Sequence, residues 1–204
     1  MDTIDDFYVL NVGECFGEDG YIDEESLKAV IAGYECNINP DVNRFLKNNA
    51  IEFTKKHQSV TYLIFHIGTG KLVGYFTLAI KPITVTCEGF SRVLQKKIAR
   101  VSQVDEESGE LYLSAYLIAQ LGKNFAQDND FGITGEQLIN IAMKQVEELQ
   151  YMVGGTVVFL ETEQNEKLLN YYEKENGFKP FRIRETKTRD GKKKKLLQML
   201  KVIN

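Results

Sequence analysis

The chain has 204 residues, of which 43% are hydrophobic and 26% are charged, an ordinary composition for one soluble globular domain. Its 25 Lys and Arg against 29 Asp and Glu give a formal net charge of −4, which argues against a broad nucleic-acid-binding surface. No apolar run approaches the ~20 residues that span a bilayer, and the acidic N-terminus lacks the pattern of a secretion signal. We therefore expect one cytoplasmic domain over residues 1–204 and no membrane segment.

The few cysteines and histidines exclude several kinds of site. Cys15, Cys36 and Cys87 are odd in number and far apart, which indicates reduced thiols rather than a disulfide framework. His57 and His66 form no metal-binding pair with each other or with a cysteine, so a zinc site is not expected. No GxSxG element is present to support a Ser–His–Asp triad. We interpret His57 as part of a solvated helix end and His66 as a structural residue that closes a strand.

The first part of the chain predicts one weak helix, one clear helix and a hairpin. Residues 1–33 form a polar, acidic N-terminal extension, in which Asp23 could cap a short helix, DEESLKAVIAGY. Apolar residues recur at helical spacing within 40–58, PDVNRFLKNNAIEFTKKHQ. In 60–80, two β-branched and aromatic runs flank the sequence GTGK, which predicts a β-hairpin. GTGK lacks the other residues of a phosphate-binding loop and is interpreted as a turn.

The second part alternates strands and helices. Residues 86–109 are interpreted as a helical insert with a short basic amphipathic helix, and residues 111–122 as the central strand of the sheet. We then expect a helix over 136–152, a strand over 156–163, a helix over 165–176 and a final pair of strands. This order indicates a mixed α/β fold with a partly antiparallel sheet. The lysine run Lys192–Lys195 is placed in the last turn, either as a solvated turn or as a phosphate contact.

Two features of this second part could carry chemistry. Gly132 and Gly135 lie where a polar loop becomes a helix, and backbone N–H groups at such a position can bind phosphate or pyrophosphate. Tyr172 follows Asn165 by seven residues, about two helical turns, so both side chains are expected on one helical face. An amide that bonds a cofactor and a phenol that donates a proton form a usable pair.

Two segments match motifs of a known family. NDFGITG occupies the place of an element written Q/R-x-x-G-x-G/A. NEKLLNYYEKENGF follows the pattern N-x-x-A-x-x-F/L-Y-E-x-x-G-F at Asn165, Tyr171, Tyr172, Glu173, Gly177 and Phe178. From about Tyr34 to its C-terminus, the chain resembles the GNAT superfamily of N-acetyltransferases. The resemblance implies a GNAT-like α/β (α+β) fold, with a mixed, mostly antiparallel sheet flanked by helices on both faces. It also implies acetyl-CoA as cosubstrate and no metal.

The resemblance assigns roles to particular residues. Backbone groups at the end of the central strand would bind the pantetheine arm, namely those of Leu121, Gly122 and Lys123. The loop before the next helix would bind the pyrophosphate through Gly132, Ile133, Thr134, Gly135 and Glu136. Asn165 and Tyr171 would complete the cofactor site, and Tyr172 would protonate the departing CoA thiolate. Glu161 and Glu163 are candidates for taking the proton of the amine.

The substrate is less determined. The segment YECNINPDVNRFLKNNAIEF, the hairpin and the insert are similar to acetyltransferase toxins of toxin–antitoxin pairs, which modify the amino group of aminoacyl-tRNA. The sequence differs from the family pattern at Asp130 and Ile133 and by one extra residue between Tyr172 and Gly177. We expect transfer to a primary amine of unknown identity, with a non-catalytic CoA- or partner-binding protein and a tRNA-directed toxin as alternatives. A tRNA or antitoxin partner and a homodimer stay open.

Overall fold

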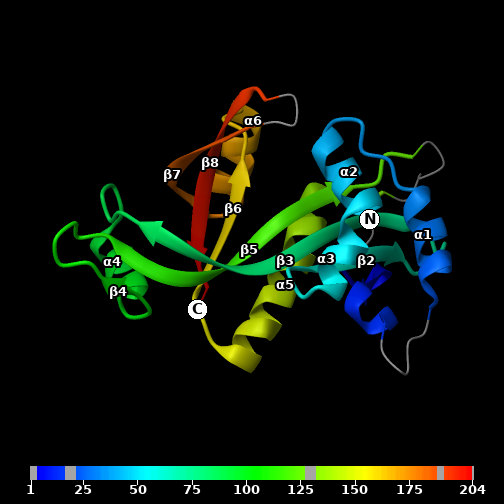
Figure 1. Cartoon of the computed structure of the whole chain (residues 1–204), viewed down its shortest axis with the longest axis horizontal. Coiled ribbons are helices and arrows are strands. Elements are labelled where there is room, and N and C mark those ends of the chain that lie inside the picture. Colours follow the sequence, from blue (N-terminus) through cyan, green and yellow to red (C-terminus); the bar gives the residue numbers. More distant parts are fainter. Residues whose placement is uncertain (1–3, 17–21, 127–131, 188–190, 204) are drawn as a thin grey trace. The chain divides into compact units, whose positions relative to one another are not determined.

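Figure 1 shows the computed structural model of the chain, which describes residues 4–16, 22–126, 132–187 and 191–203. The chain divides into two compact units. Unit 1 comprises Met1–Ala79 and Ala119–Gln145, and unit 2 comprises Ile80–Ile118 and Val146–Asn204. Two long strands, β3 (Leu72–Val85) and β5 (Leu111–Lys123), contribute residues to both units. The organisation into a single acetyltransferase domain stays a prediction.

Unit 1 is a sheet with the strand order β1-β2-β3-β5 and helices on both faces. Its further elements are η1 (Ile4–Asp6), β1 (Phe7–Asn11), η2 (Val12–Phe16), α1 (Glu24–Ala32), α2 (Pro40–Asn48), α3 (Ala50–Lys55), β2 (Val60–His66) and the start of α5 (Gly135–Val153). β2 pairs antiparallel with both β1 and β3. Leu27, Ile31 and Leu46 of the first helices pack with Leu63 of β2 in one hydrophobic core.

The helices of unit 1 begin and end where the local chemistry dictates. α1 starts at Asp23 as predicted, because the Asp23 carboxylate accepts a hydrogen bond from the Ser26 N–H at 2.9 Å. The single helix expected within 40–58 is wrong in one respect. It is broken at Asn49, which leaves the helical conformation with φ −125° and joins α2 to α3. β1 was not predicted at all, since residues 1–33 were interpreted as an extension with one helix.

Unit 2 is a mixed sheet with the strand order β3-β5-β6-β8-β7, to which β4 adds beside β5. Its elements are α4 (Arg92–Ala99), β4 (Gln103–Val104), β6 (Val157–Thr162), α6 (Glu166–Leu169), the π-helix η3 (Asn170–Glu175), β7 (Lys179–Lys187) and β8 (Lys193–Val202). β5 pairs parallel with β6 over Tyr116–Ile118, whereas β8 pairs antiparallel with β6 and with β7. The predicted mixed, mostly antiparallel sheet is therefore confirmed.

Two expectations for unit 2 need correction. Lys193–Lys195 lie in β8 rather than in a turn, and two of them form ion pairs: Lys194 with Glu163 at 2.8 Å and Lys195 with Glu185 at 3.5 Å. The helix expected over 165–176 is α-helical only at its start and continues as the π-helix η3. α5 does end at Gly154 and Gly155 as predicted, where both glycines have positive φ.

Candidate functional site

The end of β5 forms the edge strand of unit 1. β3 lies on its inner side, and in the described part of unit 1 no strand pairs with its outer side. An open strand edge presents backbone N–H and C=O groups that can bind an extended ligand. Of the predicted positions, Leu121 and Lys123 are half-buried and Gly122 is buried. This edge has the chemistry that the predicted binding of a pantetheine arm requires.

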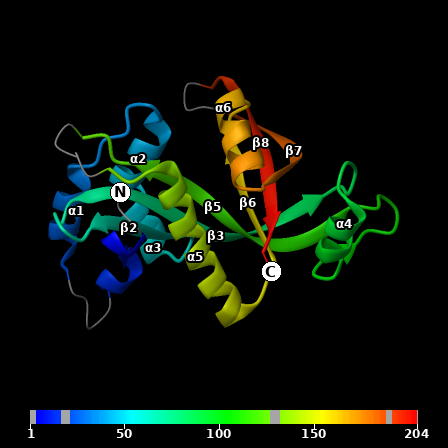
Figure 2. The same ribbon diagram turned by 180° about the vertical axis from the view of Figure 1, so that it is seen from behind.

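Gly122 is a point of close approach between β5 and the segment joining α1 to α2. A Cβ atom at Gly122 would lie 2.3 Å from Tyr34 Oη and 2.4 Å from Val42 Cγ1. On the opposite face of the sheet, a Cβ at Gly74 would lie 3.0 Å from the Gly122 carbonyl oxygen and 3.3 Å from Ile133 Cγ2. Figure 2 shows α5 in front of β3 and β5 on that face. Glycine at both positions lets the helical layers approach the strands closely.

The sequence did not reveal the unusual environment of Tyr34, whose side chain lies in this region. Tyr34 is fully buried, its ring packs edge-on against Tyr75 at 5.2 Å, and its hydroxyl has no hydrogen-bond partner among the residues that the structure describes. Burial raises the pKa of Tyr34, and the nearby Tyr75 and Cys36 add to that rise. A buried polar group without a partner is uncommon, because its desolvation is not compensated. No motif marks this position in the sequence.

The start of α5 carries a reciprocal cap that the sequence analysis did not use. Thr134 Oγ1 accepts from the Gln137 N–H at 3.1 Å, and Gln137 Oε1 accepts from the Thr134 N–H at 2.8 Å. Ile133 is fully buried beside Leu138, whereas Gly132, Thr134 and Glu136 are exposed. The predicted pyrophosphate-binding segment is therefore anchored at one residue and presents its neighbours to solvent. Asp130 lies outside the described residues.

Tyr172 lies on the π-helix of unit 2, half-buried between two other aromatic rings. Its ring centroid is 5.0 Å from that of Tyr171 and 6.1 Å from that of Phe178. Burial raises the pKa of Tyr172 to about 12, so its phenol is protonated at neutral pH. Its hydroxyl forms no hydrogen bond with any residue that the structure describes. The phenolic proton of Tyr172 is thus not donated to any residue that the structure describes.

The π-helix accounts for the extra residue before Gly177. The wider turn closes with hydrogen bonds to the Tyr171 carbonyl oxygen from the Asn176 N–H at 3.2 Å and from Asn176 Nδ2 at 2.8 Å. Gly177 then adopts φ +73°, a left-handed conformation typical of a glycine after a helix end, as predicted. The insertion is absorbed within one turn, which keeps Phe178 packed against Tyr172.

Asn165 has a local role that the seven-residue spacing did not suggest. It is the N-cap of α6, and its Oδ1 accepts a hydrogen bond from the Lys167 N–H at 2.9 Å. Its side chain therefore stabilises the start of the helix that leads to Tyr171 and Tyr172. The binding roles of Asn165 and Tyr171 stay predictions.

Glu161 and Glu163, the two carboxylates considered as general bases, both form ion pairs with cationic side chains. Glu161 forms an ion pair with Arg184 at 2.9 Å and accepts a hydrogen bond from Gln198 Nε2 at 2.8 Å. Glu163 forms the ion pair with Lys194 described above. Groups committed to cationic partners are poorly placed to take a proton from a substrate amine.

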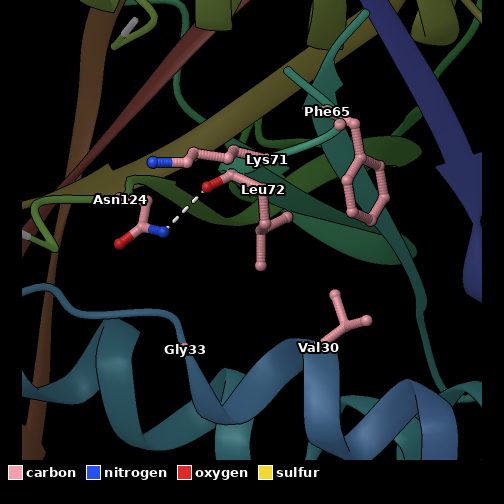
Figure 3. Close-up of a pocket in the computed structure, with 7 residues that line it drawn as sticks. Val30, Gly33, Phe65, Lys71, Leu72 and Asn124 are labelled. Atoms are coloured by element: carbon pink, nitrogen blue, oxygen red, sulfur yellow. Dashed lines mark hydrogen bonds between the residues drawn. The ribbon is translucent and has the colours of Figure 1, made fainter. Parts of the chain in front are cut away.

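A small pocket of about 200 Å³ lies in unit 1, and none of the predicted site residues lines it. Figure 3 shows Phe65 and Leu72 of the β2–β3 hairpin facing Val30 of α1 across it. At its edge, Asn124 Nδ2 donates to the Leu72 carbonyl oxygen at 2.7 Å, and Asn124 Oδ1 accepts from the Glu35 N–H at 3.0 Å. Asn124 thereby fixes the segment after α1 to the end of β5. The lining is mainly apolar and indicates no particular reaction.

Other kinds of site find no support in the described residues. Within them no group of three or more His, Cys, Asp or Glu side chains could hold a metal ion, and all three cysteines are free. None of the helices in these ranges is long and apolar enough to cross a membrane.

Comparison with known proteins identifies the fold. No protein-family model and no curated protein sequence matches the chain, but solved structures do. A mutant of the toxin KacT with a Tyr→Phe substitution matches with a TM-score of 0.61 and 18% identity, over 97% of this chain and 95% of that chain. The chain therefore has the fold of these toxins, which confirms the fold expected from the resemblance.

Two structures of the toxin AtaT share this fold. AtaT complexed with acetyl-methionyl-tRNAfMet matches with a TM-score of 0.60 and 17% identity, over 94% of each chain. A Tyr→Phe mutant of AtaT, bound to the C-terminus of the antitoxin AtaR and to acetyl-CoA, matches with a TM-score of 0.56 and 15% identity. That match covers 97% of this chain and 93% of the AtaT chain.

Proposed function

We propose that this protein is an acetyl-CoA-dependent N-acetyltransferase that transfers an acetyl group to a primary amine. The observation that carries the proposal is Tyr172, a half-buried phenol with a pKa raised to about 12 and a hydroxyl without a hydrogen bond in the described chain. Such a group is suited to protonate a leaving thiolate at neutral pH. The fold shared with AtaT structures that contain acetyl-CoA supports this function.

The cofactor is proposed to bind at the residues predicted for it. In unit 1, the open edge at Leu121–Lys123 supports backbone bonding to the pantetheine arm, and exposed Gly132 and Glu136 flank the cap at the start of α5. The cap itself occupies the N–H groups of Thr134 and Gln137. We therefore assign the pyrophosphate to other backbone donors of this segment, those of Gly132, Ile133 and Glu136.

The reaction is proposed as direct acyl transfer without a covalent enzyme intermediate. The amine nitrogen attacks the thioester carbonyl carbon, and the carbonyl π electrons move to oxygen, where a backbone N–H of the β5 edge can stabilise the negative charge. When the carbonyl re-forms, the C–S bond breaks and its electron pair leaves on sulfur. Tyr172 then donates its proton to that sulfur. Holding the two reactants in attack geometry supplies much of the rate.

The proton lost by the amine is assigned to solvent. Glu161 and Glu163 are the carboxylates that the sequence offered, but each has a cationic partner in the structure. Water is a sufficient acceptor, because the nitrogen becomes strongly acidic once it bonds to the carbonyl carbon.

For the acceptor, we propose the amino group of an aminoacyl-tRNA. This choice is supported by the shared fold with AtaT in complex with acetyl-methionyl-tRNAfMet. Structures of AtaT with the antitoxin AtaR likewise support an antitoxin as a partner to be sought. A homodimer stays a prediction.

The test combines titration calorimetry with a transfer assay. Acetyl-CoA is titrated into the wild type, Tyr172→Phe and the matched control Tyr151→Phe, whose phenol is 94% exposed. We expect comparable binding by all three proteins. Transfer of labelled acetyl groups to methionyl-tRNA should then fall on the order of 10²-fold or more only in Tyr172→Phe.

Other outcomes separate the alternatives. Binding without transfer to any aminoacyl-tRNA or small amine would support the non-catalytic CoA-binding alternative. Equal loss of transfer in Tyr151→Phe and Tyr172→Phe would remove the specific role of Tyr172. No binding of acetyl-CoA by the wild type would overturn the proposed function.

A further inference from the structure

One helix of unit 2 has a charge pattern that its own stability does not require. α4 carries Arg92 and Lys96, and its C-cap residue Arg100 keeps a helical conformation, so the three cations at i, i+4 and i+8 form one row along its surface. All three residues are exposed, and none of them forms an ion pair within the described chain. We call these three residues the α4 row.

The α4 row lies opposite the face that anchors the helix. Ile98 is fully buried and Leu94 packs beside it, in a cluster with Val85 and Leu111. On a helix with 100° per residue, Leu94 and Ile98 project opposite Lys96, the middle of the row. Gln95 fixes the start of the helix further, because its Nε2 donates to the carbonyl oxygens of Cys87 and Phe90. The three cations are therefore held on the exposed face of a helix whose opposite face is packed against the core.

On the first three helices a surface cation forms an ion pair with a nearby acidic residue, whereas on α4 the row of cations has no such pair among the described residues. α1, α2 and α3 each contain an ion pair at i,i+3 or i,i+4: Glu24 with Lys28, Asp41 with Arg44, and Glu52 with Lys56. Each of these pairs neutralises one cation of its helix. α4 has no acidic residue with which to form such a pair.

The first turn of α4 is unusual in the same way. The other α-helices have an acidic residue in the first turn, which the helix dipole favours. α4 has none and begins with Arg92, a cation at the positive end of the dipole. The cations of its last turn suit the dipole, but Arg92 does not. Helix stability therefore does not account for the complete row.

Two of the carboxylates near α4 in the sequence, Asp105 and Glu110, have partners outside the helix. Asp105 Oδ1 accepts from the N–H groups of Glu107 and Ser108 at 3.0 and 2.9 Å and so closes the turn after β4. Glu110 accepts a hydrogen bond from the Tyr112 hydroxyl at 3.2 Å. Within the described ranges no carboxylate forms an ion pair with the row, which leaves its three cations available to an external anion.

The charge of the chain is also unevenly divided. Unit 2 contains 17 Lys and Arg against 14 Asp and Glu, whereas unit 1 contains 8 against 15. The net charge of −4, which argued against a nucleic-acid surface, therefore arises in unit 1. Unit 2 has a net positive charge, and a row of three cations within it can attract a polyanion.

We infer that the α4 row binds the phosphate backbone of the RNA acceptor. The inference rests on the proposed function, which supplies an RNA as the substrate. Successive members of the row lie about 6 Å apart along the helix axis, so that each can contact a different phosphate of one strand. Phosphate contacts of this kind position a substrate without reading its sequence.

The test measures RNA binding by fluorescence anisotropy with fluorescein-labelled, deacylated tRNA over a range of KCl concentrations. The row variant is Arg92→Gln, Lys96→Gln and Arg100→Gln, since glutamine keeps the helix propensity. The matched control removes three exposed helical cations of unit 1, as Lys28→Gln, Lys47→Gln and Lys144→Gln. Both variants change the net charge equally.

We expect the row variant to bind about tenfold more weakly at low salt, and its log–log salt dependence to be shallower by about 2 to 3. The control should bind within about threefold of the wild type. Equal weakening in both variants would overturn the inference, because net charge alone would then explain the effect. A row variant that binds like the wild type would overturn it as well.

Two parallel measurements keep the conclusions separate. Acetyl-CoA titration of the same proteins tests the proposed function. If the row variant binds tRNA as tightly as the wild type while all proteins still bind acetyl-CoA, only the inference about α4 is overturned. Binding to vesicles of phosphatidylcholine with 30% phosphatidylglycerol tests an anionic membrane instead. Row-dependent binding to vesicles without binding to tRNA would overturn RNA as the partner.

Discussion

Two residues packed against the end of β5, Tyr34 and Val42, explain why this strand has glycine at position 122. The Tyr34 hydroxyl and Val42 Cγ1 occupy the volume that a side chain at Gly122 would need. Within the described part of the chain, the Tyr34 hydroxyl has no hydrogen bond that a substitution would remove. The contact is thus a matter of packing, and it ties the α1–α2 segment to the strand proposed to bind the cofactor.

We expect Gly122→Ala to lower the free energy of unfolding by about 1–3 kcal/mol, because the added methyl group overpacks a dense site. Tyr34→Phe alone should be neutral or slightly stabilising, since it removes an uncompensated buried hydroxyl. In the double variant, the cost of Gly122→Ala should be smaller, because the nearest clashing atom is gone. Urea denaturation of the four proteins measures the coupling. Strict additivity would mean that Tyr34 is not the obstacle.

The pKa of Tyr172 sets a second expectation at this scale. Burial raises it to about 12, so the protonated acid is present throughout neutral pH and is lost only as the pH rises through about 12. We therefore expect the single-turnover rate of acetyl transfer to show no falling limb from Tyr172 between pH 7 and about 10. A limb near pH 9 that is present in the wild type and absent in Tyr172→Phe would contradict this assignment.

At the scale of elements, the strongly patterned segments were predicted and the context-dependent ones were not. β5, α5 and the β2–β3 hairpin have long apolar periodicities or a clear turn signal, and all three are confirmed. β1 is five residues long and owes its extended form to its partner β2, which no local pattern reveals. A run of charged residues is typical of a loop, so the sequence favours a turn at the lysines of β8. In the structure these lysines pair with β7 and therefore belong to a strand.

In the candidate site, too, residues marked by a motif were predictable and features that depend on packing were not. Motif residues were predictable because type and spacing mark them, as for Gly177 after the helix that carries Tyr172. The π-helix and the cap role of Asn165 depend on how a local insertion is absorbed, which the motif alone does not specify. The close approach of Tyr34 to Gly122 depends on tertiary packing between distant segments.

The reciprocal cap at the start of α5 gives a prediction for an element. Thr134→Ala removes the acceptor for the Gln137 N–H, and it should lower the free energy of unfolding by about 1 kcal/mol. Gln137→Ala removes the acceptor for the Thr134 N–H and should have a cost of similar size. Because the two bonds support the same turn, the double variant should cost less than the sum. Urea denaturation decides, and a neutral Thr134→Ala would show that the cap contributes nothing.

For the whole molecule, the uneven division of charge between the two units changes what the net charge of −4 implies about nucleic-acid binding. The average over 204 residues is acidic, but unit 2 has more cations than anions. An average excludes a uniformly basic surface and says nothing about a local one. The proposed RNA substrate is therefore compatible with the acidic composition, because one positively charged region is sufficient for phosphate contacts.

The proposed function also has a consequence for a cell that makes the protein. Acetylation converts the nucleophilic amine of an aminoacyl-tRNA into an amide, whose nitrogen lone pair is delocalised and cannot attack the next ester. We expect induced expression of the wild type in a bacterium to arrest growth and protein synthesis within minutes. Tyr172→Phe should relieve the arrest, and the exposed control Tyr151→Phe should preserve it.

Measuring growth, methionine incorporation and acetylated aminoacyl-tRNA in the same cultures separates the outcomes. Arrest by Tyr172→Phe equal to that of the wild type, with equal acetylation, would show that transfer does not depend on this phenol. Arrest without acetylated tRNA would place toxicity elsewhere. No arrest by the wild type, despite acetyl-CoA binding in vitro, would exclude the tRNA-directed toxin and direct the search to other amines. The arrest is therefore informative only together with its chemical product.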